Sequence, residues 1–147
     1  MENNGSFKGI QTGWTLIFAA WIVVAIASLG SLFFSEVMGV PVCVLCWYQR
    51  VAMYPLTFIL PVGLFPYDPK VVRYVGVLVG MGWFIALFHV LLVGGVIPKS
   101  VRPCVQGIPC SETYLSLFGF LTIPLMSLLT FTLVAFLLFS VQRIESS

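Results

Sequence analysis

Long stretches without a charged residue are the feature that most limits how this chain can fold. Trp14 to Ser35 holds 22 residues without a charge, and Tyr74 to Ile97 and Thr113 to Gln142 are also charge-free. A further apolar run, 44–65, is interrupted only by Arg50. A helix needs about 20 apolar residues to cross a hydrocarbon layer of about 30 Å. Each of the four segments is therefore long enough to span a membrane.

The composition agrees with a bilayer environment. With a mean hydropathy of +1.08 and only 8% charged residues, a chain of 147 residues has more apolar surface than a soluble core of that size can bury. The connections are short, so consecutive helices must be antiparallel neighbours. We predict one all-α integral-membrane domain over residues 1–147, an up-down four-helix bundle with transmembrane helices at approximately 14–35, 44–65, 72–97 and 113–140. We predict kinks at the three prolines inside them: Pro55, Pro61 and Pro124.

The basic residues predict the orientation of the bundle. Four of them fall on one side of the predicted membrane and two on the other; they are Lys8, Lys70, Arg73 and Arg143 against Lys99 and Arg102. The positive-inside rule then predicts a multi-pass protein of the bacterial cytoplasmic membrane, with both termini in the cytoplasm. The first apolar run is longer than the core of a signal peptide, so we expect a retained helix. The net charge of +2, without a basic stripe, indicates no nucleic-acid partner.

All four cysteines then fall on the outer side: Cys43, Cys46, Cys104 and Cys110. Disulfides persist outside the cytoplasmic membrane, so two thiol pairs at that surface indicate redox chemistry or structural bridging. Cys104 and Cys110 lie in the loop VRPCVQGIPC, where a bridge would close a small ring that a thiolate of another protein can attack. Four cysteines allow three connectivities, and all three stay open here.

The first pair lies in the stretch PVCVLCWYQR. Cys43 and Cys46 are spaced C-x-x-C at the start of a helix, where unpaired backbone N–H groups and the positive end of the helix dipole favour a thiolate. Arg50 follows Cys46 by four residues, so the two share a helix face and the cation favours ionised sulfur further. An arginine one turn inside a membrane helix needs a partner. A ligand with carbonyl oxygens would satisfy both Arg50 and the amide of Gln49, and a quinone fits that description.

His89 is the single histidine of the chain and falls in the outer half of the third helix. A lone histidine of this kind is commonly a packing residue with one hydrogen bond. It also lies within reach of a quinone ring, so we retain it as a second-rank quinone contact that donates a hydrogen bond or a proton.

The residues CVLCWYQR, followed after the third helix by PCVQGIPC, resemble the DsbB family of bacterial disulfide-bond formation proteins, and most closely its short BdbC-like branch. The resemblance covers essentially the whole chain. It implies a membrane oxidoreductase that takes electrons from a thioredoxin-fold dithiol oxidase of the DsbA or BdbD type and passes them to ubiquinone or menaquinone. It also implies roles for the cysteines: Cys104, paired with Cys110, receives the partner, and electrons pass to Cys43 and Cys46. In this scheme Cys46 contacts the quinone and Arg50 binds one of its carbonyl oxygens.

Three other interpretations stay open. The first is a non-catalytic tetraspan scaffold with two static disulfides, although a C-x-x-C bridge restrains little chain. The second is a metal site made of the four thiolates, a ligand set that selects zinc or copper(I); we predict no metal. The third is a quinone reductase resembling vitamin K epoxide reductase, which carries its C-x-x-C on a late helix.

Overall fold

The structure is a computed structural model that describes residues 3–39, 42–96, 98, 116–117 and 121–146. It consists of four long helices, joined by one π-helical turn and two short strands. The helices are α1 (Asn3–Leu32), α2 (Val44–Leu64), α3 (Val71–Val93) and α4 (Ile123–Ser146), the turn is η1 (Phe33–Val37), and the strands are β1 (Ser116–Leu117) and β2 (Leu121–Thr122). The predicted outer cysteine pair, Cys104 and Cys110, lies outside the described residues.

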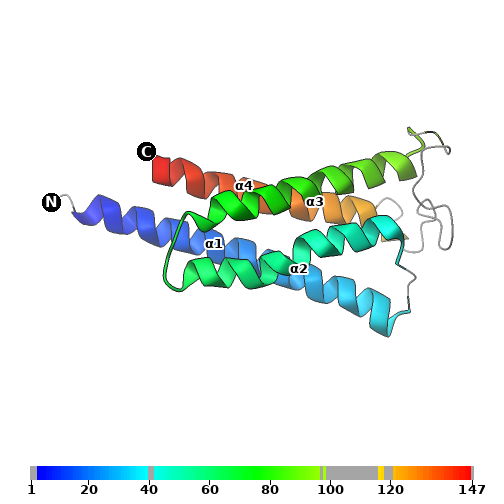
Figure 1. Cartoon of the computed structure of the whole chain (residues 1–147), viewed down its shortest axis with the longest axis horizontal. Helices are drawn as coiled ribbons and strands as arrows, with labels where there is room; N and C mark the ends of the chain where they lie inside the picture. Colours follow the sequence, from blue (N-terminus) through cyan, green and yellow to red (C-terminus); the bar gives the residue numbers. More distant parts are fainter. Residues whose placement is uncertain (1–2, 40–41, 97, 99–115, 118–120, 147) are drawn as a thin grey trace.

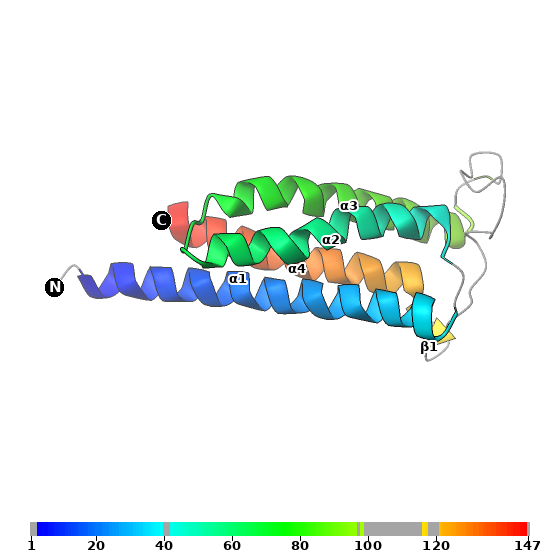
Figure 2. The same cartoon turned by 60° about the horizontal axis from the view of Figure 1, so that its bottom comes forward.

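The four helices form an up-down bundle. Helix α1 packs against α2 and α4, and α3 packs against the same two helices, so the order around the bundle follows the chain. Both termini lie at one end, and the segment that joins α1 to α2 lies at the other (Figures 1 and 2). The four-helix up-down architecture predicted from the sequence is confirmed, and the short antiparallel pair β1–β2 is an addition that the all-α prediction did not include.

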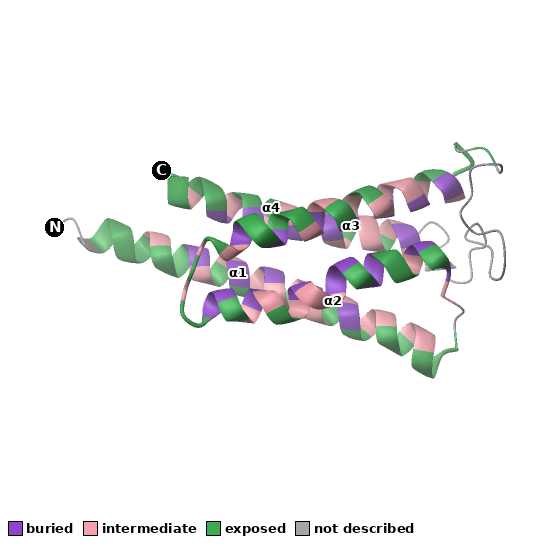
Figure 3. Cartoon of the chain, viewed as in Figure 1, coloured by how far each residue is buried: buried purple, intermediate pink, exposed green. Residues whose placement is uncertain are grey.

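Burial divides each helix into an inner and an outer face. Side chains between the helices are fully buried, among them Ile17, Leu56 and Phe131. Other large apolar side chains point outward, and Phe58, for example, is 74% exposed. Figure 3 shows the exposed residues along the outer faces of the bundle. An outer surface this apolar is favourable against lipid and unfavourable in water.

Three described helical segments are long and apolar enough to cross a membrane: Asn4–Val37, Val71–Val93 and Ile123–Ser146. Helix α2 is not among them, because Gln49, Arg50 and two prolines dilute its apolar residues. The polar pair that lowers the hydropathy of α2 is the pair that the sequence assigns to ligand binding.

The helix boundaries differ from those predicted. Helix α1 begins at Asn3, before 14, because a helix continues beyond the apolar part that hydropathy detects. Helix α3 ends at Val93, before 97, where Gly95 takes a left-handed φ of 80° that closes the helix. Helix α4 begins at Ile123, after 113, and the described residues before it form the antiparallel pair β1–β2. Lack of charge does not specify where a helix starts.

The prolines fulfil the predicted kinks only in part. Pro124 is the second residue of α4, where a missing N–H breaks no helical bond, so the predicted kink there is wrong. Pro61 lies inside α2 and leaves the carbonyl of Thr57 without its helical donor; Nε1 of Trp21 in α1 donates to that oxygen at 3.0 Å. The carbonyl that Pro61 leaves free thus accepts a hydrogen bond that links α1 to α2. Figure 1 shows α2 bent along its length.

Candidate functional site

The C-x-x-C pair opens helix α2. Cys43 is the residue before the first helical residue, with extended backbone angles, and its carbonyl accepts the amide N–H of Trp47 at 3.1 Å. Cys46 lies one turn later, so the two thiols face each other with their sulfurs 3.3 Å apart. This separation fits a hydrogen-bonded dithiol, and a small movement would bring the sulfurs to the 2.05 Å of a disulfide. The pair can therefore cycle between dithiol and disulfide.

The side chains of His89 and Gln49 form a hydrogen-bonded contact with this pair. Nε2 of His89 lies 3.8 Å from the sulfur of Cys43, and Nδ1 of His89 lies 3.2 Å from the amide nitrogen of Gln49. His89 is 2% exposed. With the Gln49 amide donating to Nδ1, the ring proton lies on Nε2 and points to the sulfur. Helix α3 thereby contributes a hydrogen-bond donor to a thiolate on α2.

These contacts act on the ionisation of Cys43. The hydrogen bond with Cys46 lowers the pKa of the Cys43 thiol well below its usual range, and the bond with His89 acts in the same direction against the opposing effect of burial. The first thiolate of the pair is therefore favoured on Cys43, whereas the family resemblance assigns the thiolate that contacts the quinone to Cys46. Because the sulfurs are within hydrogen-bond distance, one proton moving between them exchanges these two states.

Arg50 is held by helix α1. Its Nε donates to the hydroxyl of Ser31 at 2.8 Å and its Nη2 donates to the Ser31 carbonyl at 2.6 Å. The guanidinium also lies over the ring of Trp47, 5.6 Å from the centroid. Arg50 is only 9% exposed, so these contacts are what make its burial tolerable. Two of the five guanidinium N–H groups bond to Ser31, and the hydrogen bonds among the described residues leave the other three for a ligand.

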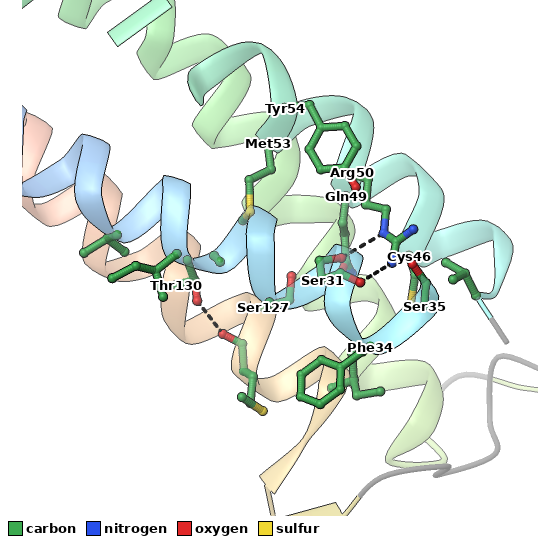
Figure 4. A pocket seen from close by; sticks show the side chains of 17 residues that line it. Ser31, Phe34, Ser35, Cys46, Gln49, Arg50, Met53, Tyr54, Ser127 and Thr130 are labelled. Carbon is green, nitrogen blue, oxygen red and sulfur yellow. Dashed lines mark hydrogen bonds between the residues drawn. The ribbon is translucent and has the colours of Figure 1, made fainter. Parts of the chain in front are cut away.

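A cavity of about 450 Å³ lies between α1, α2 and α4. This volume is within the range of small-molecule sites. Most of its lining is apolar; the polar side chains that the sequence analysis selected are Cys46, Gln49 and Arg50. Ile26, which is 66% exposed on α1, also lines it, so the cavity is reachable from the apolar outer surface. Figure 4 shows Cys46 and Arg50 at the same end of the cavity as Ser31.

The structure separates the predicted site residues into two groups. Cys46, Gln49 and Arg50 line the cavity, whereas Cys43 and His89 lie outside its lining, on the side of α3. His89 thus lies against Cys43 and Gln49, whereas the sequence led us to expect it near a quinone ring. Sequence reasoning also missed Ser31, since a serine within a long apolar run carries no signal of which helix it will face.

The same dithiol could bind a soft metal. The donor atoms of Cys43, Cys46 and His89 all lie within 4.8 Å of one another. Two thiolates and an imidazole are ligands that zinc and copper(I) accept. A disulfide between the sulfurs would remove two of these ligands, so metal binding and redox cycling compete for the same atoms.

The family model for disulfide bond formation protein DsbB matches residues 12–141. The chain is 45% identical over 120 residues to disulfide bond formation protein C of Bacillus subtilis (strain 168), covering 80% of this chain and 86% of that protein. It is 40% identical over 131 residues to a probable disulfide formation protein of Metapseudomonas resinovorans, covering 88% and 91%. No solved structure matches.

Proposed function

Because the chain belongs to the DsbB family of disulfide bond formation proteins, we propose that it is a quinone-dependent protein-disulfide oxidoreductase with four transmembrane helices. Membership of this family implies a membrane disulfide oxidoreductase. The finer proposal is that it reoxidises an extracytoplasmic dithiol oxidase of thioredoxin fold and delivers the electrons to a membrane quinone. The observation that carries the proposal is that Cys46 and Arg50 line one largely apolar cavity.

The electrons pass through two cysteine pairs. The partner's thiolate attacks a Cys104–Cys110 disulfide at Cys104, and Cys110 leaves as a thiolate. The partner's second thiol then displaces Cys104, so the partner becomes oxidised and the loop pair reduced. Exchange between the loop pair and a Cys43–Cys46 disulfide moves the two electrons to the first pair. Finally Cys43 and Cys46 form their disulfide again, giving up two electrons and two protons as the quinone becomes a quinol.

The cavity fits a quinone headgroup. Its lining is mainly apolar, as the ring and its isoprenoid tail require, and Arg50 provides N–H groups for a carbonyl oxygen. Only Cys46 of the dithiol faces this space. Cys43, hydrogen-bonded to His89, keeps the pair partly ionised, and transfer of the Cys46 proton to Cys43 brings the charge to the sulfur beside the ligand. The quinone, when bound, supplies the electron sink.

The fourth transmembrane helix in this proposal is α2. It is 21 residues long and packs between α1 and α3, and its residues Gln49 and Arg50 are buried against protein and the cavity instead of facing lipid. Cys43 and Cys46 lie at the start of α2, which is at the end of the bundle opposite the termini (Figure 1). With the termini in the cytoplasm, that end lies at the outer surface of the cytoplasmic membrane, in reach of an extracytoplasmic partner.

The test is to purify the protein from membranes, extract and identify any bound quinone, and measure quinone-dependent thiol oxidation after reconstitution. Wild-type protein should oxidise dithiothreitol only with quinone present, and Cys46→Ser should abolish turnover while the bundle still assembles. A static scaffold would assemble equally well and show no quinone-dependent oxidation in either form. That result, with no quinone extracted, would remove the proposed function.

A further inference from the structure

On α4 the hydroxyl of Ser127 differs from those of its neighbours. Thr130, Thr132 and Ser140 each donate to the carbonyl four residues earlier, and Ser146 donates to the carbonyl three residues earlier. In an apolar environment this bond satisfies the hydroxyl at little cost. Ser127 has the same bond open to it on the same helix. Its buried oxygen nevertheless has no hydrogen-bond partner within the described part of the chain.

A second buried hydroxyl has the same property. The oxygen of Tyr54 in α2 is buried, and it too lacks a hydrogen-bond partner among the residues that the structure describes. Leaving a buried hydroxyl unpaired is unfavourable, so each such group needs an explanation, and a bound water or ligand is one of them.

Tyr54 and Ser127 both belong to the residues that line the cavity containing Cys46 and Arg50, and their oxygens are covered by protein in this structure. Cys46, Arg50 and Tyr54 are spaced four residues apart on one face of α2, which puts them at successive steps of about 6 Å along the helix axis. Ser127 comes from α4. In Figure 4 Ser127 and Tyr54 lie on different helices around the same space. The cavity therefore has Cys46 and Arg50 near one end, and two of its walls contain a residue whose hydroxyl is buried and unpaired among the described residues.

We propose that Tyr54 and Ser127 are hydrogen-bond donors to the quinone headgroup, an inference that rests on the proposed function. A para-quinone has carbonyl oxygens at opposite edges of its ring and no donor of its own. Arg50 binds one oxygen, and the two hydroxyls serve the far edge of the ring. This arrangement fixes the orientation of the ring beside Cys46, which a single contact at Arg50 would leave free to rotate.

The first test measures the KM for quinone in Tyr54→Phe and Ser127→Ala, with ubiquinone-1 and menadione as acceptors and dithiothreitol as donor. Each variant should raise the KM for quinone about 3- to 10-fold, the loss expected for one hydrogen bond. The KM for dithiothreitol should not change. Thr130→Val is the matched control: Thr130 lines the same cavity, but its hydroxyl is already bonded to Met126, so its KM should stay within about twofold of wild type.

The second test measures thermal unfolding in detergent with and without added menadione, a readout independent of turnover. Without quinone both variants should be at least as stable as wild type, because each removes an unpaired donor. Added quinone should raise the unfolding midpoint of wild type more than that of either variant.

The outcomes separate the two claims. Wild-type kinetics and a wild-type quinone-induced shift in both variants would overturn the inference and leave the proposed function intact, since water alone would then satisfy the hydroxyls. A wild-type protein that neither reduces quinone nor is stabilised by it would overturn the proposed function, and the inference with it.

Discussion

Replacing Ser31 with alanine tests whether helix α1 positions the cation of the site. The change removes the hydroxyl that accepts Nε of Arg50 at 2.8 Å and keeps the main-chain carbonyl that accepts Nη2. A hydrogen bond to a charged group contributes about 1.5 to 3 kcal/mol, and we take the lower value because Ser31 is only half-buried. A loss of about 1.5 kcal/mol corresponds to roughly a tenfold fall in kcat/KM for quinone.

The assay is steady-state quinone reduction with dithiothreitol as donor, over a range of ubiquinone-1 concentrations. Ser35→Ala is the control, because Ser35 lines the same cavity but its hydroxyl donates to the carbonyl of Leu32. Ser31→Thr keeps a hydroxyl and should recover most of the activity. In an Arg50→Met background, Ser31→Ala should add little if it acts through Arg50. Wild-type kcat/KM in Ser31→Ala, or costs that simply add, would refute this role.

Three further predictions concern ionisation, packing and metal. The ultraviolet absorbance of the Cys43 thiolate should be nearly as strong at about pH 6 as at about pH 8, because a lowered pKa keeps the thiolate populated until the pH falls to that pKa. His89→Ala should move this titration to higher pH, and an unchanged titration curve would contradict the contact between His89 and Cys43. Gly82→Ala should lower the thermal midpoint, losing about 1 to 3 kcal/mol, because its Cβ would overlap the ring of Phe131, whereas Gly80→Ala has open space and should be neutral. Treatment with a chelator should leave quinone reduction unchanged; activity lost to the chelator and restored by zinc would favour a metal site.

Local spacing explains why part of the site was predictable. The start of helix α2 carries Cys46, Gln49 and Arg50, and Cys43 is its N-cap residue. Helical geometry alone therefore places these residues within about two turns of one another. Their partners come from other helices. Which residue of α1 faces Arg50, and which atom of α3 meets Cys43, depend on how the helices rotate and slide when they pack, and periodicity does not report this.

The fold was predictable to the same degree and for a related reason. A long apolar run predicts a helix, so the four helices were found, and three of them are long and apolar enough to cross a membrane. It does not determine the end of a helix, which depends on capping and on single residues such as Gly95 and Pro124. The predicted kink at Pro124 failed because the position of a proline within its helix decides its effect.

Helix α2 separates the cavity from the side of the dithiol that contacts α3. Its cavity side is formed with α1 and α4 and includes no described residue of α3, whereas α3 supplies His89 to the opposite side of the dithiol. Under the proposed function, the residues that would receive the oxidant are therefore separate from the contact that favours ionised Cys43. Substitutions in α1 and α4 would change the cavity and leave His89 in place, and substitutions in α3 would change the contact with Cys43 and leave the described cavity lining in place.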